Sequence, residues 1–258
     1  MDSVRSNVNG PRRLLEIIVP SFNEGEELRV AVDRLIERLR DSSVEDFRIR
    51  VVVDGPNQRT ISAAQDITDE RVLIEVLPMN MGKGFAIRHG FRAAESGFIA
   101  FIDGDLDISP QAIIDGLMLL QRQVNNQVGC AYGSKFHPDS QVKYPMTRRV
   151  FSSIYRFMVQ LLFGLSVDDT QTGVKVFRRE AVIDHLDDLN QNGFLFDIEI
   201  LARMSSAGWK CSAIPVIVDY NYSSTIKLKT VARMITQTIQ LALQIRRPNG
   251  AFGPNHRV

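Results

Sequence analysis

Short apolar runs rich in β-branched residues alternate with amphipathic helical patterns through the first half of this chain. The runs cover 15–20, 47–54, 71–77, 97–103 and 128–134, and the helical patterns between them cover 26–40, 58–69, 83–96 and 110–124. Because each run is continuously apolar, both faces of each strand are expected to be buried. The pattern therefore predicts an α/β fold with a mostly parallel sheet covered by helices on both faces.

Composition narrows the class of protein further. A hydrophobic content of 44% in 258 residues is enough for one sizeable core, and a net charge of +1 argues against nucleic-acid binding driven by bulk charge. Cys130 and Cys211 lie in apolar segments without metal-ligand spacing, which favours reduced, buried thiols. The sequence contains no secretory h-region and no run of 18 uncharged apolar residues, so we expect a cytoplasmic protein without a transmembrane helix.

Polar and glycine-rich segments follow the first four predicted strands. They read "SFNE", "DGPN", "NMGKG" and "DGDLD" in chain order. The carboxyl ends of parallel strands meet at one edge of a sheet, where such folds bind their ligands. We therefore expect these four loops to form one site.

The "DGDLD" segment places Asp103, Asp105 and Asp107 directly after a strand. It has four interpretations: a polar turn, a calcium loop, an aspartyl nucleophile or a divalent cation site. A calcium loop requires Gly and Glu where the chain has Ile108 and Ile114, and an aspartyl nucleophile normally lies near the start of its domain. We favour a Mg²⁺ or Mn²⁺ site, because a cation that bridges to a diphosphate also relieves the repulsion between the carboxylates.

The segment "NMGKGFAIRHG" is weaker evidence for a phosphate-binding loop. Leu77 and Gly84 exclude a Walker loop, and Ile87 excludes a dinucleotide fingerprint. Its position after a strand nevertheless favours contact with phosphate.

The last third of the chain carries two long helical patterns. The helix predicted over 148–165 is apolar nearly all round, which fits either a buried core helix or a helix lying in a membrane interface. The helix predicted over 226–246 is amphipathic and basic, and no acidic residue follows Asp219. We divide the chain into a flexible N-terminus (1–13), one α/β domain (14–222) and a basic C-terminal helix and tail (223–258).

Seven segments, taken in order, resemble family 2 glycosyltransferases with a GT-A fold. They are "IIVPSFNEGEEL", "VVVDGPN", "NMGKGFAIRHGF", "FIDGDLD", "YGSKF", "DTQTGVKVFRRE" and "FLFDIEIL". More narrowly, they are similar to dolichol- and polyprenyl-phosphate glycosyltransferases, over about residues 15–230. The resemblance implies a nucleotide-sugar donor, a divalent metal and a lipid-phosphate acceptor.

The resemblance also implies roles for individual residues. The residues implied to bind the nucleotide sugar are Pro20, Phe22, Glu24, Asp54, Lys83, Asp103, Gly104 and Lys227, and the implied metal ligands are Asp103, Asp105 and Asp107. Lys135, Arg149 and Ser153 match the acceptor-phosphate positions. We expect Asp105, Lys135, Arg149 and Asp197 to carry the catalysis.

Several of these residues have a structural alternative. Glu24 is also suited to supporting the following helix N-terminus, and Lys135 and Arg149 to being solvated surface charges. Asp197 and Glu199 lie among apolar residues, where they either form a hydrogen-bonded structural pair or line the acceptor side.

The expected function is inverting, metal-dependent transfer of a hexose from GDP-mannose or UDP-glucose to a polyprenyl or dolichyl phosphate at an anionic membrane surface. A membrane-anchor protein or a second copy of the chain is a further expected partner. One rival is a soluble family 2 transferase that glycosylates a carbohydrate or small-molecule hydroxyl, with Asp197 or Glu199 as base. The other is a non-catalytic nucleotide-sugar-binding subunit, suggested by Val53 and Pro56, which depart from the family motif.

Overall fold

The computed structural model describes residues 14–105, 107–123, 127–142, 146–218 and 228–245. Within the two helices that begin at 146 and 228, the side chains of 146–152 and 228–233 lie outside this description. The predicted flexible segment 1–13 lies outside it too, as do residues 223–227 and 246–258 of the predicted C-terminal helix and tail.

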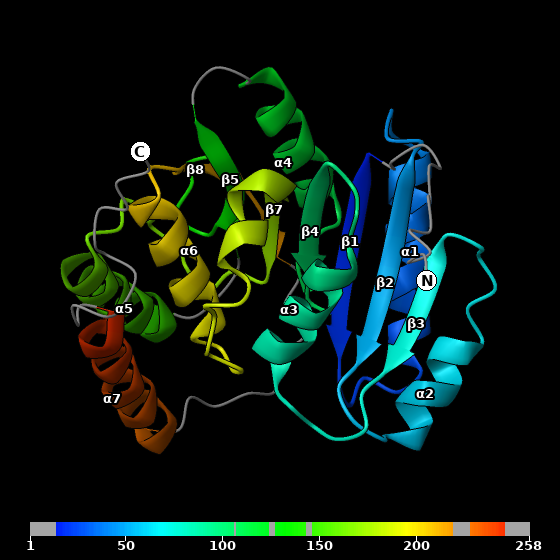
Figure 1. Ribbon diagram of the computed structural model, residues 1–258, viewed down its shortest axis with the longest axis horizontal. Helices are drawn as coiled ribbons and strands as arrows, with labels where there is room; N and C mark the ends of the chain where they lie inside the picture. Colours follow the sequence, from blue (N-terminus) through cyan, green and yellow to red (C-terminus); the bar gives the residue numbers. More distant parts are fainter. Residues whose placement is uncertain (1–13, 106, 124–126, 143–145, 219–227, 246–258) are drawn as a thin grey trace, which may run out of the picture.

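A seven-stranded sheet forms the centre of the molecule (Figure 1). Its order is β3-β2-β1-β4-β7-β5-β8, and every strand runs parallel to its neighbours except β7, which is antiparallel to both β4 and β5. The strands are β1 (Leu15–Ser21), β2 (Phe47–Val53), β3 (Val72–Val76), β4 (Phe98–Ile102), β5 (Val128–Ser134), β7 (Val174–Arg178) and β8 (Lys210–Pro215). The mostly parallel sheet predicted from the apolar runs is confirmed.

Helices cover both faces of this sheet, as the sequence predicts. One face packs against α1 (Glu27–Arg40), α2 (Gln58–Gln65) and α4 (Gln111–Arg122), and the other against α3 (Lys83–Ala93) and α6 (Phe196–Ser206). Successive side chains of a strand point to opposite faces, so Ile17 and Val19 join the first core while Ile18 joins the second. Two-sided burial explains why the strands are apolar throughout.

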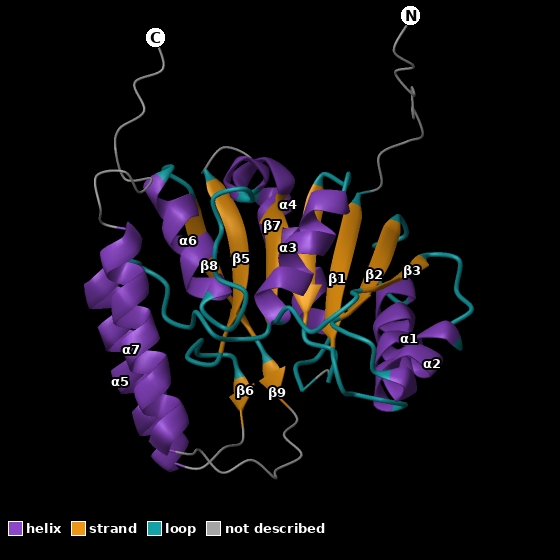
Figure 2. Ribbon diagram, turned by 60° about the horizontal axis from the view of Figure 1, so that its bottom comes forward, coloured by secondary structure: helices purple, strands orange, loops and turns teal. Residues whose placement is uncertain are grey.

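Smaller elements complete the carboxyl edge of the sheet. The two-residue strands β6 (Gln141–Val142) and β9 (Ile217–Val218) pair in parallel below it (Figure 2). Two short 3₁₀ turns, η1 (Arg179–Ala181) and η2 (Ile183–His185), follow the antiparallel β7 and lie at the opposite edge, beside the start of β4.

The helices α5 (Met146–Phe163) and α7 (Leu228–Ile245) lie side by side at one end of the molecule (Figures 1 and 2). Tyr155 Oη and Thr238 Oγ1 join them at 2.9 Å. Val159 of α5 is buried in the core, whereas Phe157 is 67% exposed. The helix predicted over 148–165 therefore has one buried and one exposed apolar side. None of the helices in the described part of the chain combines the length and hydrophobicity that a membrane crossing requires.

Candidate functional site

A hollow of about 260 Å³ opens at the carboxyl ends of β1, β2 and β4. Its walls are formed by Pro20, Ser21, Phe22, Glu24, Asp54, Lys83, Asp103, Gly104, Asp105 and Phe194. All of these except Ser21 and Phe194 are residues that the sequence assigned to a nucleotide sugar or a metal. The structure thus brings the strand-end loops together, while their binding roles stay predictions.

Two larger hollows, of about 490 and about 620 Å³, lie over α1 and α2. Their charged side chains are surface groups that pair with one another, such as Arg29 and Asp33 at 3.8 Å. The hollow at the strand ends is smaller, but it alone of the three contains the glycine-rich loop and the aspartate motif. We therefore take it as the candidate site.

Glu24 closes the loop that follows β1. Its Oε2 accepts hydrogen bonds from Ser21 Oγ at 2.6 Å and from the backbone N–H of Phe22 at 2.7 Å. These contacts hold the Phe22 ring, 48% exposed, at the wall of the hollow. Glu24 therefore has a turn-forming role that neither sequence interpretation anticipated.

Asp54 connects the end of β2 to the glycine-rich loop. Its two carboxylate oxygens accept from the backbone N–H groups of Met81 at 2.6 Å and Gly82 at 2.8 Å. Gly82 has a φ of +99°, and a Cβ there would collide with the carbonyl of Asn192. Asp54, which is 4% exposed, thus fixes a turn that only glycine adopts without strain.

The backbone N–H groups at the start of α3 are already hydrogen-bonded within the protein. The N–H groups of Gly84 and Phe85 both donate to the Asn192 carbonyl, at 2.7 and 3.2 Å. The backbone donors of Met81, Gly82, Gly84 and Phe85 are therefore satisfied internally. What the loop offers to the hollow is the side chain of Lys83.

Lys83 forms an ion pair inside the hollow. Its Nζ lies 2.6 Å from Asp103 Oδ1 and 5.5 Å from the centroid of the Phe101 ring. Burial acts to lower the pKa of Lys83, but the negative charges of Asp103 and Asp197 outweigh it and raise the pKa above its ordinary value. Lys83 is consequently a permanent cation beside the aspartate motif.

Asp103 occupies a closely fitted cradle at the end of β4. Its backbone N–H donates to the carbonyl of Gly173 at 2.9 Å, and a Cβ on Gly173 would collide with the Asp103 carboxylate. Oδ1 is buried and accepts no hydrogen bond of acceptable geometry, despite the nearby ammonium of Lys83. A buried oxygen with spare acceptor capacity is suited to a cation.

Asp105 is the second carboxylate of the motif. The residue is exposed, yet desolvation of its carboxylate and the negative charge of Asp103 raise its pKa. Its Oδ1 accepts from the backbone N–H of Asp107 at 3.2 Å. Within the described ranges, no three His, Cys, Asp or Glu side chains are grouped to hold a metal, so the predicted triplet does not converge. Two carboxylates still fit Mg²⁺ or Mn²⁺, because phosphate and water commonly complete the shell of Mg²⁺.

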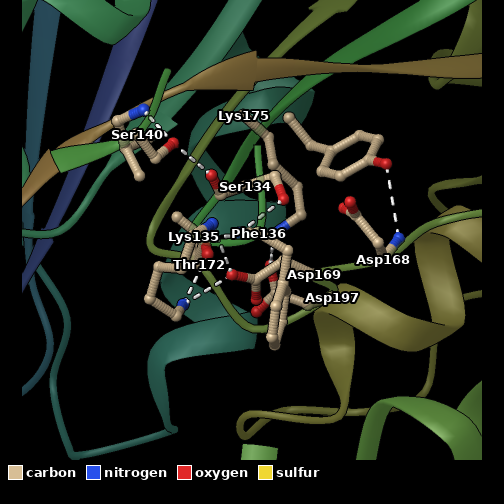
Figure 3. A network of polar contacts seen from close by, with 11 residues as sticks. Ser134, Lys135, Phe136, Ser140, Asp168, Asp169, Thr172, Lys175 and Asp197 are labelled. Atoms are coloured by element: carbon tan, nitrogen blue, oxygen red, sulfur yellow. Dashed lines mark hydrogen bonds and ion pairs between the residues drawn. The ribbon is translucent and has the colours of Figure 1, made fainter. Parts of the chain in front are cut away.

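A second polar cluster lies at the end of β5 (Figure 3). Lys135 Nζ contacts Asp169 Oδ2 at 2.8 Å and donates to Thr172 Oγ1 at 2.6 Å, and the Lys135 backbone N–H also donates to Asp169, at 3.0 Å. Burial acts to raise the pKa of Asp169, but the charge and hydrogen bonds of Lys135 lower it overall. Lys135 is thus a paired, partly buried cation and not a solvated surface charge.

Asp197 and Glu199 have separate structural partners. Asp197 Oδ1 accepts from Nζ of the fully buried Lys175 at 2.5 Å, and Asp197 itself is 2% exposed. Glu199 Oε2 accepts from the backbone N–H groups of Asn190 and Gln191 at 2.9 and 2.8 Å. They do not pair with each other, and neither is placed as an accessible base.

Other predicted residues are placed only in part. Ser153 lies in α5, as does the backbone of Arg149, whose side chain is outside the described part of the chain. Lys227 lies outside the described residues altogether. Sequence reasoning missed Lys175 and Phe194, since one lies within a strand and the other in a loop distant along the chain.

Strand-end carboxylates, Lys83 and glycine-rich turns thus lie together at one edge of a mostly parallel sheet. A model of the family described as "Glycosyl transferase family 2" matches residues 16–186. The chain therefore belongs to glycosyltransferase family 2.

Relatives of known name agree with this membership. The chain is 30% identical to human dolichyl-phosphate beta-glucosyltransferase, over 75% of this chain and 63% of the relative. It is 28% identical to glycosyltransferase AglD of Haloferax volcanii, over 78% of this chain and 32% of that protein. It thus spans less than two thirds of the length of both.

Solved structures show the same fold. Glucosyl-3-phosphoglycerate synthase from Mycobacterium tuberculosis, in complex with Mn²⁺, UDP and glucosyl-3-phosphoglycerate, aligns with a TM-score of 0.62 at 17% identity. The alignment covers 89% of this chain and 80% of the other. At this identity the likeness concerns the fold alone.

Proposed function

We propose that the protein transfers glucose from UDP-glucose to a polyprenyl or dolichyl phosphate. The observation that carries this proposal is the hollow in which Lys83, Asp103 and Asp105 meet the loop after β1. Glucose is favoured over mannose because dolichyl-phosphate beta-glucosyltransferases are among the relatives, and UDP is chosen because it is the nucleotide bound in a solved structure of the same fold. A lipid phosphate is favoured as acceptor because of the same relatives.

Donor binding would use both walls of the hollow. Phe22 and Phe194, which are 48% and 64% exposed, offer ring faces on which a nucleobase can stack. Lys83 would bind the diphosphate, and Asp103 and Asp105 would hold Mg²⁺ or Mn²⁺. When bound, that metal supplies positive charge to the departing diphosphate.

The reaction needs orientation more than proton transfer. An oxygen of the acceptor phosphate attacks C1 of the sugar from the face opposite the diphosphate, the C1–O bond to the diphosphate breaks, and the configuration at C1 inverts. A phosphate monoester is already anionic at neutral pH, so no base has to remove a proton. The buried, paired Asp197 and Glu199 therefore count against the rival in which one of them activates a hydroxyl.

The acceptor's lipid chain requires a membrane surface. Ile154, Phe157 and Leu161 of α5 are 61%, 67% and 69% exposed, and Leu243 of α7 is 61% exposed. These side chains would insert into the interface of an anionic bilayer, so that the protein binds the membrane peripherally. An anchor protein or a second copy of the chain stays an untested prediction.

Calorimetric titration tests the donor and the metal together. We expect UDP-glucose to bind in the presence of Mn²⁺ and much more weakly without it, and GDP-mannose to bind poorly. Asp105→Asn should abolish the Mn²⁺-dependent part of UDP-glucose binding. Asp66→Asn, at the exposed end of α2, should leave it unchanged. Transfer is then measured with a polyprenyl phosphate. Metal-independent binding would contradict the proposed site, and tight binding without transfer to any acceptor would favour the binding-subunit rival.

A further inference from the structure

Lys135, the cation expected to hold the acceptor's phosphate, already has its charge balanced. Its Nζ contacts Asp169 and Thr172, and Asp169 is 6% exposed. A phosphate that took over this ammonium would leave a buried carboxylate without its counter-charge, which is costly. A further cation at this end of the sheet would bind phosphate without breaking that pair, and Arg149, also predicted for this role, has its side chain outside the described residues.

Arg156 of α5 is a cation of this kind. Its Cζ lies 4.5 Å from the centroid of the Phe136 ring, and Phe136 directly follows Lys135 in the chain. Its Nε is buried and has no hydrogen-bond partner. Among the described residues, no carboxylate lies within ion-pair distance of its guanidinium. An arginine that packs on an aromatic ring and has N–H donors without a partner is suited to bind an anion.

The fold places this guanidinium on the acceptor side of the hollow. β5, which ends just before Lys135, is parallel to β4 and separated from it only by β7. Two strand spacings amount to about 10 Å, roughly the length of a hexose and a phosphate. The two sites also meet directly, because Thr172 contacts Lys135 while the adjacent Gly173 forms the cradle of Asp103.

The helix itself connects Arg156 to a lipid surface. Arg156 lies three residues after Ser153, so both fall on one side of α5. The exposed residues Ile154, Phe157 and Leu161 follow the adjacent side. A lipid lying against the apolar side would therefore have its headgroup next to Arg156.

We propose that Arg156 binds the phosphate monoester of the acceptor, and that Lys135 is a positioning residue that orders the loop carrying Phe136. The assignment rests on the proposed function. The guanidinium has two parallel N–H donors for two phosphate oxygens, and the Phe136 ring fixes its plane.

The test measures binding of geranyl phosphate, geraniol and inorganic phosphate to the full chain saturated with UDP and Mn²⁺. We expect Arg156→Gln to weaken geranyl phosphate binding roughly tenfold to a hundredfold, as for a charge-assisted hydrogen bond, and to leave geraniol and UDP binding unchanged. Arg156→Lys should restore part of the affinity. Arg29→Gln, on the exposed surface of α1, is the matched control. Inorganic phosphate should compete with geranyl phosphate in the wild type and lose that ability in Arg156→Gln.

The outcomes separate this inference from the function on which it rests. If the wild type binds geranyl phosphate and Arg156→Gln binds it equally well, the assignment to Arg156 is overturned and the proposed function stands. If the wild type binds no geranyl phosphate, the lipid-phosphate function itself is overturned. A purely structural role would instead lower the Tm and UDP binding of Arg156→Gln together, and Arg156→Lys, which retains the charge, would decide whether phosphate affinity follows stability or charge.

Discussion

Gly173 and Asp103 make the closest steric fit in the candidate site. A methyl group on residue 173 would occupy the space of the Asp103 carboxylate, so Gly173→Ala should push that carboxylate out of the hollow. We expect Mn²⁺-dependent binding of UDP-glucose to fall at least tenfold, measured by calorimetry. Gly97→Ala is the matched control, because a Cβ on Gly97 meets no atom within 4 Å. Equal loss in both variants would show that the effect is general destabilisation.

Lys83 should influence the metal and the donor in opposite directions. Its ammonium neutralises Asp103 before any ligand arrives, and it is also the cation placed to meet a diphosphate. We expect Lys83→Met to tighten Mn²⁺ binding in the absence of donor roughly tenfold and to weaken UDP binding in the absence of metal. Electron paramagnetic resonance of free Mn²⁺ measures the first and calorimetry the second.

Lys83→Arg is the control for this prediction, because it keeps the positive charge. It should behave like the wild type in Mn²⁺ binding. Looser Mn²⁺ binding in Lys83→Met would mean that the lysine supports the metal site instead of competing for it.

At the residue scale, sequence reasoning identified side chains that follow strands. Phe22, Lys83 and Asp105 could be predicted to converge because strand ends share one edge of a sheet. Lys175 could not, since a lysine in the middle of a strand gives no sign of the buried aspartate it pairs with. Nor could the internal use of Asp54, whose partners come from the next loop.

At the element scale, Asp69 ties the start of β3 to α1. It accepts from Arg71 Nε and Nη2 at 2.9 and 2.7 Å and from Arg40 Nη2 of α1 at 2.9 Å. The hydrogen bond from Arg71 is the main cause that lowers the pKa of Asp69 from 3.8 to about 2. Because the folded pKa lies below the unfolded one, this stabilisation is present above pH 3.8 and is lost as the pH falls towards 2.

Asp69→Asn should therefore lower the free energy of unfolding by about 2 kcal/mol at neutral pH, and the deficit should shrink as the solution is acidified. Urea unfolding at a series of pH values measures it. The exposed Asp66→Asn serves as control. A deficit that does not change with pH would mean that the lost contact is not electrostatic.

Elements of the first half could be predicted to within about four residues, and so could α5 and α7, whereas β7 and α6 could not. The early strands are continuously apolar and lie between amphipathic helices, so the change in hydrophobic pattern from strand to helix can be recognised in the sequence. In β7 the buried Lys175 interrupts the apolar run, and its antiparallel direction depends on strands far away along the chain. α6 is buried nearly all round, which leaves no amphipathic stripe to reveal a helix.

At the scale of the whole molecule, α5 and α7 present apolar side chains on one end. Phe157→Asp places a charge where membrane insertion is proposed, so sedimentation with anionic vesicles should fall several-fold while UDP binding is retained. Val30→Asp is the matched control, because Val30 of α1 is also exposed, at 52%. Unchanged sedimentation of Phe157→Asp would direct attention to a protein partner.

The antiparallel strand β7 has an evolutionary consequence. No hydrogen bond joins β4 directly to β5 in the sheet, because β7 pairs with both. The half of the sheet that carries the donor hollow and the half that carries Lys135 and Phe136 are therefore separate units held in register by one shared strand. Substitutions that retune one half for a new acceptor would leave the other half's recognition of the nucleotide intact only if they spare Thr172 and Gly173, where the two halves touch. Natural selection can thus vary the two specificities separately as long as β7 and the Thr172–Gly173 segment before it are kept.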